Sequence, residues 1–405
     1  MDASPLYLTE DDRYERFRLI AWWDQEKLAR AKILVVGAGA LGNEALKNLA
    51  LLGVGNIYVI DFDEIEASNL TRSVLFRRRD VGKSKAAAAV DALRDLNPEI
   101  NVVGWRGNVL TDLGLGLFQE MDAVIGCLDN REARLWVNRC CWKVGTPWID
   151  GGIQVIDGVI KVFKPGAGNP CYECGMSDAD YRLINLRYSC PLLRREDILA
   201  GKVPTAPTIS SMIAGLQVQE ALKVVHGMQS EPGAAYVFNG VSNQFYKTVY
   251  PYKDDCLSHE TYPAPIPVSL TADSTADQLF AQVADLSKSQ LPQDPATSFP
   301  TPRLNLDRDL VVALSDPASG YRKEIYQPIQ KVGMEAATLG AGVVARPELI
   351  HHVDAGTEIA RRRLSDVGVP PFDIVRVATP QGTWFLRLEG DRERVLGGGL
   401  SGSSS

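Results

Sequence analysis

The sequence lacks any uninterrupted apolar run long enough to cross a membrane, and the segment from Met1 to Glu10 is polar and acidic rather than typical of a secretion signal. A cationic excess is also absent. The 43 Lys and Arg residues stand against 50 Asp and Glu, and a net charge of −7 argues against a nucleic-acid partner. We therefore expect a soluble, cytoplasmic protein whose partners include neither a membrane nor a nucleic acid.

Cysteine is scarce, with seven residues in a chain of 405. An odd number of cysteines in a chain of this length makes a poor disulfide framework and fits metal ligands plus a free thiol better. Hydrophobic residues make up 45% of the chain, which is enough for a sizeable core, and the length predicts two or three domains.

The segment from Lys32 to Asp63 has the pattern of a βαβ unit. A short β-branched run at 33–36 predicts a buried strand, and the loop Gly37-Ala38-Gly39-Ala40-Leu41-Gly42 follows at once. An amphipathic helical pattern comes next, and a second strand ends at Asp61. Glycines in this position let the backbone approach a phosphate, which the free N–H groups of the helix N-terminus also attract.

Asp61 lies 19 residues after Gly42, where an acid suits a ribose hydroxyl. The order of strand, loop, helix, strand and acid predicts a nucleotide site rather than a structural glycine turn. The fingerprint alone is compatible with NAD or FAD, but the residues after it favour ATP. The predicted fold class is α/β, a Rossmann-like doubly wound sheet.

Charged residues that follow the unit fit a nucleotide triphosphate. Asp63 lies beside the predicted phosphate loop, and Arg72 and Lys85 supply positive charge there, although a charge run is more often a solvated face. Asp129 ends a further apolar strand. Because open α/β sheets bind ligands at the carboxyl ends of their strands, Asp129 is a candidate ligand for Mg²⁺.

Two short pairs predict a second metal site. Cys171 and Cys174 form a C-x2-C knuckle, and Cys256 and His259 form a C-x2-H pair after 81 intervening residues. Together they make a Cys₃His set suited to tetrahedral Zn²⁺. The alternative is four unrelated residues, because the spacing between the two pairs is long.

Cys190 stands apart, in a polar and basic stretch with Arg187, Arg194 and Arg195 nearby. Positive charge lowers the pKa of a thiol, so Cys190 is a candidate nucleophile, with an incidental surface cysteine as the alternative. Cys127, Cys140 and Cys141 fall in strand or helix patterns and are expected to be buried apolar residues.

Composition changes around residues 251–267, where prolines suggest a linker. We expect a first domain at 1–260 and a smaller α+β domain at 261–395, with a flexible tail at 396–405. Other expectations are helices at 10–31 and 358–366, and a hairpin at 235–250. His351 and His352 are expected to be incidental and without partners.

Taken in order, the segments GAGALG, IDFDEIEASNLTR, VGKSK, CLDN, IDGG, CYEC and AGLQVQEALKVVHG resemble the ThiF/MoeB/ubiquitin-activating superfamily. The resemblance spans roughly residues 10–260, and SNLTR and GCLDNREARLWVN are most similar to the ubiquitin-like activating enzymes. The last third of the second domain resembles, more weakly, the ubiquitin-fold domain that recruits a conjugating enzyme.

The resemblance implies a set of roles for residues of this chain. It implies a nucleotide loop, a ribose acid, phosphate-holding groups, a Mg²⁺-positioning acid and an arginine that reaches into a partner protomer's active site. It also implies a zinc site, in which His259 replaces the usual last cysteine, and an acceptor cysteine. The corresponding residues are Gly37, Gly39 and Gly42; Asp61; Asn69, Arg72 and Lys85; Asp129; Arg16; Cys171, Cys174, Cys256 and His259; and Cys190.

The function implied is ATP-dependent adenylation of the C-terminal glycine of a ubiquitin-like protein by a homodimer, with thioester capture on Cys190 and transfer to a conjugating enzyme. Two alternatives stay open. One is an adenylyltransferase that feeds sulfur onto a carrier protein for thiamin or molybdopterin synthesis. The other is a non-catalytic scaffold subunit of an activating heterodimer, against which the full set of nucleotide-facing residues argues.

Overall fold

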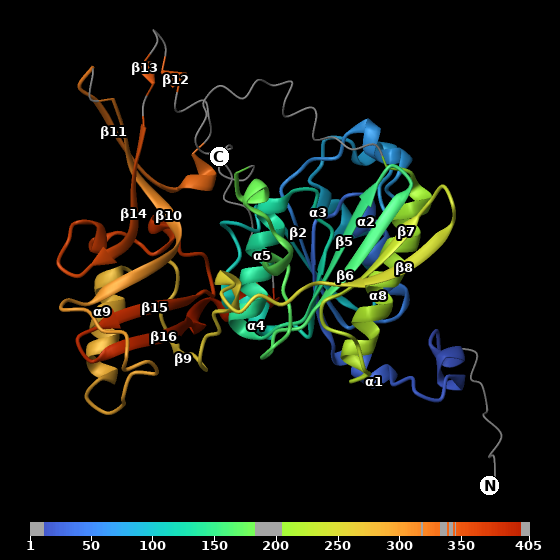
Figure 1. The fold of residues 1–405 in the computed structure, drawn as a ribbon, viewed down its shortest axis with the longest axis horizontal. Helices are drawn as coiled ribbons and strands as arrows, with labels where there is room; N and C mark the ends of the chain where they lie inside the picture. Colours follow the sequence, from blue (N-terminus) through green and yellow to red (C-terminus); the bar gives the residue numbers. More distant parts are fainter. Residues whose placement is uncertain are drawn as a thin grey trace.

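The computed structural model describes residues 12–182, 205–316, 319–332, 338–339, 343–344 and 346–397. Cys190 and the residues around it lie outside these ranges. Figure 1 shows two main sheets side by side, a larger one built from the first part of the chain and a smaller one built from the last part. None of the described helices is long and apolar enough to span a membrane.

The first sheet has eight strands in the order β3-β2-β1-β4-β5-β6-β7-β8. The five strands from β3 to β5 pair in parallel, and the strands beyond β5 pair antiparallel. Strand order reverses between β1 and β4, which is the switch point where such sheets bind ligands. The bounds are β1 Lys32–Val36, β2 Asn56–Asp61, β3 Asn101–Arg106, β4 Ala123–Gly126, β5 Trp148–Gln154, β6 Asp157–Phe163, β7 Ala234–Asn239 and β8 Gln244–Val249.

Helices cover both faces of this sheet, so the predicted doubly wound α/β fold is confirmed. Ile33 and Val35 of β1 belong to a core with α2, α3 and α8, whereas Leu34 and Val36 belong to a core with α4 and α5. This alternation follows from the two-residue period of a strand that is buried on both faces. The helices are α1 Gln25–Arg30, α2 Ala40–Leu51, α3 Lys85–Leu96, α4 Leu115–Glu120, α5 Arg131–Val144 and α8 Pro207–Val225.

The second sheet is mostly antiparallel and has six strands, with β9 parallel to β16 at one edge and β10 paired to β11, β14 and β15. Its core includes the buried side chains of α9. The bounds are β9 Ile266–Val268, α9 Ala276–Leu286, β10 Arg303–Asp316, β11 Tyr321–Pro328, β14 Arg346–Asp354, β15 Ile374–Thr379, β16 Gly382–Leu388 and α11 Arg392–Gly397, with a short pair β12 Thr338–Leu339 and β13 Val343–Val344 beside it.

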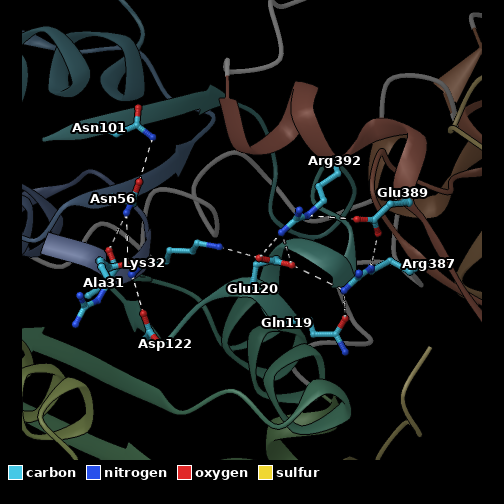
Figure 2. Close-up of polar contacts among 11 residues, drawn as sticks. Ala31, Lys32, Asn56, Asn101, Gln119, Glu120, Asp122, Arg387, Glu389 and Arg392 are labelled. Carbon is cyan, nitrogen blue, oxygen red and sulfur yellow. Dashed lines mark hydrogen bonds and ion pairs between the residues drawn. The ribbon is translucent and has the colours of Figure 1, made fainter. Parts of the chain in front are cut away.

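The two regions meet along α4 and α5. Figure 2 shows Glu120, at the end of α4, between Lys32 of β1 and the side chains of Arg387 and Arg392. Deeper in the interface the Asp373 carboxylate accepts the Leu115 N–H at 2.7 Å. Apolar side chains from β15, β16 and α11 join the same core as α4 and α5.

Several local expectations need correction. In the described part of the helix expected at 10–31, residues 12–31 do not form one helix: a 3₁₀ turn, η1 (Glu15–Leu19), and α1 are separated by extended backbone at Ile20 and by Asp24, whose side chain caps α1. Residues 358–366 contain two 3₁₀ turns instead of a helix. Both histidines of β14 have acidic partners, with His351 Nδ1 at 2.7 Å from Asp309 and His352 Nε2 at 3.5 Å from Asp354.

Parts of the expected linker at 251–267 and of the expected tail at 396–405 belong to a strand and a helix. Pro267 lies inside β9, where an edge strand can accommodate a residue that lacks an N–H. Leu396 and Gly397, at the start of the expected tail, complete α11.

Candidate nucleotide site and metal centre

The glycine loop joins β1 to α2 at the switch point of the first sheet. Gly37 has a φ of +97°, and a Cβ there would lie 2.5 Å from the Cys127 carbonyl oxygen. A Cβ on Gly42 would lie 1.9 Å from the Gly37 carbonyl oxygen, so neither position admits a side chain. Gly39, at the N-cap of α2, is different because nothing lies within 4 Å of the position of its Cβ. The loop is thus tightly packed underneath and open above the helix N-terminus, as a phosphate cradle must be.

Two polar side chains hold this loop in shape. Asn43 Nδ2 donates to the Ala38 and Gly39 carbonyl oxygens at 2.7 and 3.0 Å. Asp61 accepts the Ala38 N–H at 2.7 Å and the Asp63 N–H at 2.8 Å. Burial raises the pKa of Asp61, although the charge of Lys85 and the two backbone amides act against the rise. The predicted ribose acid therefore also fixes the loop, and Asn43 is a contributor that the sequence pattern did not reveal.

The predicted cation Lys85 lies at the same edge of the sheet. It is the first residue of α3, its side chain is 11% exposed, and its Nζ lies 2.7 Å from Asp63 Oδ2. Asp63 is half-exposed, so the ammonium group is held next to solvent by an exchangeable partner. Asn69 Oδ1 accepts the Glu66 N–H at 2.9 Å in the neighbouring turn η2 (Ala67–Thr71), and Arg72 donates to the Ser68 carbonyl oxygen at 3.0 Å.

Asp129 is exposed on the loop that follows β4, the strand that pairs with β1. Arg134 of α5 fixes this loop, because its Nη2 donates to the Leu128 carbonyl oxygen at 2.6 Å and its Nε lies 3.1 Å from Asp150 Oδ1. Lys161 lies 3.1 Å from the other Asp150 oxygen. The buried Asp150 thus organises two cations beneath the loop, so Arg134 is a positioning residue for Asp129.

Gln217 of α8 is a second contributor that the sequence pattern did not reveal. Its Nε2 donates to the carbonyl oxygens of Gly126 at 2.8 Å and Ile149 at 3.1 Å, which ties the carboxyl end of β4 to the first residues of β5. Cys127 lies beside it with its Sγ 3.9 Å from Gln217 Oε1. Burial raises the pKa of the Cys127 thiol, so this cysteine stays protonated and is not a nucleophile at neutral pH.

Arg16 is the one predicted nucleotide-site residue among those described that the fold places elsewhere. It is exposed on η1, in the segment that leads through α1 to the amino end of β1. The glycine loop lies at the carboxyl end of the same strand. The start of the described chain accordingly lies at the far end of α3 from Lys85: Tyr14 accepts a hydrogen bond from Asn97, the C-cap of α3, whereas Lys85 is the first residue of that helix. Arg16 therefore does not serve the glycine loop of its own chain in this structure.

The four predicted metal ligands come together although 81 residues lie between the two pairs. Their ligand atoms all lie within 4.8 Å of one another. Cys171 Sγ is 3.8 Å from Cys174 Sγ and 3.6 Å from Cys256 Sγ, and His259 Nε2 is 3.4 Å from Cys174 Sγ. A tetrahedron with Zn–S bonds has edges of about 3.8 Å, so the donor set fits a tetrahedral metal ion.

A supporting shell holds this cluster. Glu173, between the two knuckle cysteines, is 2.6 Å from an Arg139 guanidinium nitrogen and accepts the Tyr181 hydroxyl at 2.6 Å; it also accepts the Ser258 hydroxyl. Burial opposes ionisation of Glu173, but these partners outweigh it and its pKa lies below the ordinary value. The His259 ring stacks on Trp142 at 4.5 Å between ring centres. The ligand orientations are therefore set by neighbouring side chains.

Residues 12–258 match the ThiF family, and the chain belongs to that family. The match begins at η1 and ends within the metal cluster, so it covers the first sheet and leaves out the second.

Two curated relatives illustrate the range of the family. Over 150 residues the chain is 41% identical to SUMO-activating enzyme subunit 2 of Dictyostelium discoideum, covering 37% of this chain and 22% of that protein. Over 172 residues it is 37% identical to the sulfur carrier protein adenylyltransferase of Thermus thermophilus, covering 41% of this chain and 64% of that protein. The matched part thus spans about a fifth to just under two thirds of these relatives.

Among solved structures, the Microcin C7 biosynthetic enzyme MccB in complex with N-formylated MccA is similar with a TM-score of 0.52 and 25% identity. It covers 63% of this chain and 77% of that one. This likeness agrees with the α/β architecture of the first sheet.

Proposed function

We propose that this protein uses ATP and Mg²⁺ to adenylate the C-terminal glycine of a ubiquitin-like protein. One observation carries the proposal: the open cradle at Gly39, the Lys85 ammonium group and the exposed Asp129 carboxylate share the carboxyl edge of the first sheet at its switch point. Family membership and relatives that activate SUMO or adenylate a sulfur carrier support it.

The chemistry requires little covalent work from the protein. A carboxylate is a poor acyl donor because oxide would have to leave, whereas the mixed anhydride with AMP has a good leaving group. The carboxylate oxygen attacks the α-phosphorus, and the bond from that phosphorus to the bridging oxygen of pyrophosphate breaks. The attacking group is already ionised, so no general base is needed.

The residues at the cradle have distinct roles in this proposal. The N–H groups at the start of α2 face the phosphates, and Asp61 holds the ribose. Lys85 exchanges Asp63 for phosphate oxygens, and Arg72 and Asn69 add further donors. Asp129 would position Mg²⁺, which neutralises charge on the phosphates when bound. Catalysis then rests on in-line placement and charge neutralisation.

The position of Arg16 supports a homodimer. Because Arg16 lies at the amino end of the strands, away from its own glycine loop, it can contribute to catalysis only at the site of a second copy. A second protomer that brings its Arg16 to the phosphates would complete the charge neutralisation. Each site would then be incomplete in the monomer.

The Cys171, Cys174, Cys256 and His259 cluster is proposed to hold structural Zn²⁺. Three thiolates and an imidazole would fill the four positions of a tetrahedral ion and leave no open position for substrate. The ion would cross-link the segment after β6 to the segment after β8. It would thereby tie the last residues of the ThiF region to the sheet that carries the nucleotide site.

Cys190 lies outside the described residues, and its role as thioester acceptor is a proposal from sequence. A thiolate there would attack the acyl carbon of the anhydride and release AMP. That residues 261–395 form a separate ubiquitin-fold domain, which recruits a conjugating enzyme, is likewise a prediction from sequence. The second candidate function, adenylation of a sulfur-carrier protein, is favoured by the Thermus relative.

A gel experiment separates these functions. The purified protein is mixed with ATP, Mg²⁺ and small proteins that end in glycine, and is run without reductant beside Cys190→Ala. A thiol-sensitive adduct that the variant lacks supports thioester capture. Pyrophosphate release without an adduct in either protein favours the sulfur-carrier function. Absence of both signals with every carrier tested contradicts adenylation and favours the scaffold alternative.

A further inference from the structure

The N-terminal arm, residues 12–24, carries Arg16, has a hydrogen-bond anchor near each end, and packs Trp23 against the core beside the second anchor. At its start, the Tyr14 hydroxyl accepts the Asn97 Nδ2–H at 2.7 Å, and Arg13 donates to the Leu96 carbonyl oxygen at 3.1 Å. The Tyr14 ring packs where a Cβ on Gly53 would lie, 2.4 Å from the ring carbon that bears the hydroxyl. The start of the arm is thus fixed to the ends of α2 and α3.

The other anchor is His226, the C-cap of α8. The Asp24 backbone N–H donates to His226 Nε2 at 3.1 Å, and His226 Nδ1 lies 2.8 Å from the Leu222 carbonyl oxygen. A backbone N–H can only donate, so Nε2 must carry a lone pair. A carbonyl oxygen can only accept, so Nδ1 must carry the proton. The two backbone partners therefore fix His226 as the neutral tautomer protonated on Nδ1.

We propose that His226 is a pH-sensitive latch for the N-terminal arm. Protonation of Nε2 removes the lone pair that accepts the Asp24 N–H and points one N–H at another. The Asp24 amide then loses its partner, and the end of the arm that leads into α1 is held less tightly, by the packing of Trp23 and the Asp24 cap alone. The remaining anchor, the Asn97 Nδ2–H donated to the Tyr14 hydroxyl, does not involve His226, so the arm stays attached at its start.

The charged groups near His226 are already paired with one another, so protonation of His226 Nε2 is the change that affects the Asp24 N–H. Asp24 caps α1 by accepting the Lys27 N–H at 3.1 Å, and its carboxylate lies 3.7 Å from Lys27 Nζ. On α8, Lys223 is paired with Glu220. The remaining partners are the rings of Trp22 and Trp23, with centres 5.3 and 5.6 Å from the imidazole. These acidic groups thus have cationic partners before His226 is protonated.

This inference deepens the proposed function, since it makes His226 a positioning residue for Arg16. Arg16 lies between the two anchors, on η1. Release of one anchor would let η1 move and would lower the fraction of time for which Arg16 meets the second copy's phosphates. Imidazole side chains in general change charge between about pH 5 and 8, which sets the range over which the latch is tested.

Hydrogen exchange followed by mass spectrometry tests the latch in the full-length protein. After correction for intrinsic rates, exchange of the peptide containing Asp24 should rise about tenfold from about pH 7.5 to about pH 5.5. His226→Gln retains an acceptor in place of Nε2 and should show no such rise. His226→Ala should exchange fast at both pH values. His351→Gln, on the second sheet, is the matched control and should behave as the wild type.

Equal exchange at both pH values in the wild type, or a rise of the same size in His226→Gln, overturns the latch. A second readout concerns Arg16. ATP–pyrophosphate exchange should fall more steeply on acidification in the wild type than in His226→Gln. If hydrogen exchange changes as expected but the activity profiles of the two proteins coincide, the latch stands and its link to Arg16 is contradicted. If neither protein exchanges pyrophosphate at any pH, the proposed function fails and the latch is unaffected.

Discussion

The nucleotide cradle and the Cys/His cluster use polar groups in opposite ways. At the cradle, Gly39 faces open space, Lys85 holds a half-exposed partner and Asp129 is exposed. In the cluster the thiols and the imidazole face one another, and Glu173 beside them is enclosed by three donors. An open set of polar groups awaits a ligand that arrives and leaves, whereas a closed set serves stability. The following changes should separate activity from stability along this line.

The largest effect is expected at the cluster. Cys174→Ser should abolish zinc binding and lower the free energy of unfolding by on the order of 5 kcal/mol, because metal binding and folding are coupled. Elemental analysis and thermal unfolding with and without a chelator measure both effects. Cys140→Ala removes a buried thiol outside the cluster and should retain the metal with a smaller loss of stability. Full metal content and unchanged stability in Cys174→Ser would contradict a role of the cluster in metal binding and stability.

Lys85→Ala should give the reverse result. Loss of one charge stabiliser at the phosphates should lower the adenylation rate by about 10²- to 10³-fold. Its partner Asp63 is half-exposed, so stability should change by less than about 1 kcal/mol. Lys83→Ala is the matched control, because Lys83 pairs with Asp80 at 2.9 Å on the same loop and is 56% exposed. An equal loss of activity in both variants would mean that general charge, rather than Lys85, matters.

The six-residue glycine loop contains both a position expected to affect stability, Gly42, and a position expected to affect nucleotide binding, Gly39. Gly42→Ala places a methyl group 1.9 Å from the Gly37 carbonyl oxygen and should cost about 3 kcal/mol of stability. Gly39→Ala meets no atom, so stability should stay within about 0.5 kcal/mol while ATP affinity falls about tenfold. Urea unfolding and nucleotide titration measure the pair. Unchanged ATP affinity in Gly39→Ala would show that phosphates do not lie above the helix start.

The α/β fold and the glycine loop with its acid could be predicted from the sequence because they depend on local patterns. Strand, glycine loop and helix are contiguous, and the spacing to Asp61 follows from one βαβ unit. The contributions of Asn43, Arg134 and Gln217 could not be predicted, since each is a hydrogen bond to backbone carbonyls that only the packed tertiary structure brings near. The single helix predicted at 10–31 is wrong for the described residues 12–31, because the Asp24 cap and the Asp24–His226 contact favour a break before α1.

The smallest effect concerns the closed interface between the two regions. Burial raises the pKa of Asp373 to about 6, although the charge of Arg308 acts against the rise. The folded state therefore binds the proton more tightly than the unfolded state, whose Asp pKa is about 3.9. This contribution to stability is fully present below about pH 4 and is lost as pH rises to about 6, an effect of about 2 to 3 kcal/mol.

Asp373→Asn tests this assignment because an amide oxygen can still accept the Leu115 N–H but cannot titrate. Denaturant unfolding between about pH 4 and 6.5 should show a smaller fall in stability for the variant than for the wild type. Parallel curves for the two proteins would mean that Asp373 titrates alike in the folded and unfolded states.

The most direct test of the account is carrier-dependent ATP–pyrophosphate exchange. With a ubiquitin-like carrier that ends in glycine, the wild type should incorporate labelled pyrophosphate into ATP, because adenylation of the carboxylate is reversible. Lys85→Ala should slow this exchange by about 10²- to 10³-fold, and a carrier whose C-terminal carboxylate is amidated should not support it. Exchange that persists with the amidated carrier, or that is undiminished in Lys85→Ala, would contradict carboxylate activation at the glycine loop.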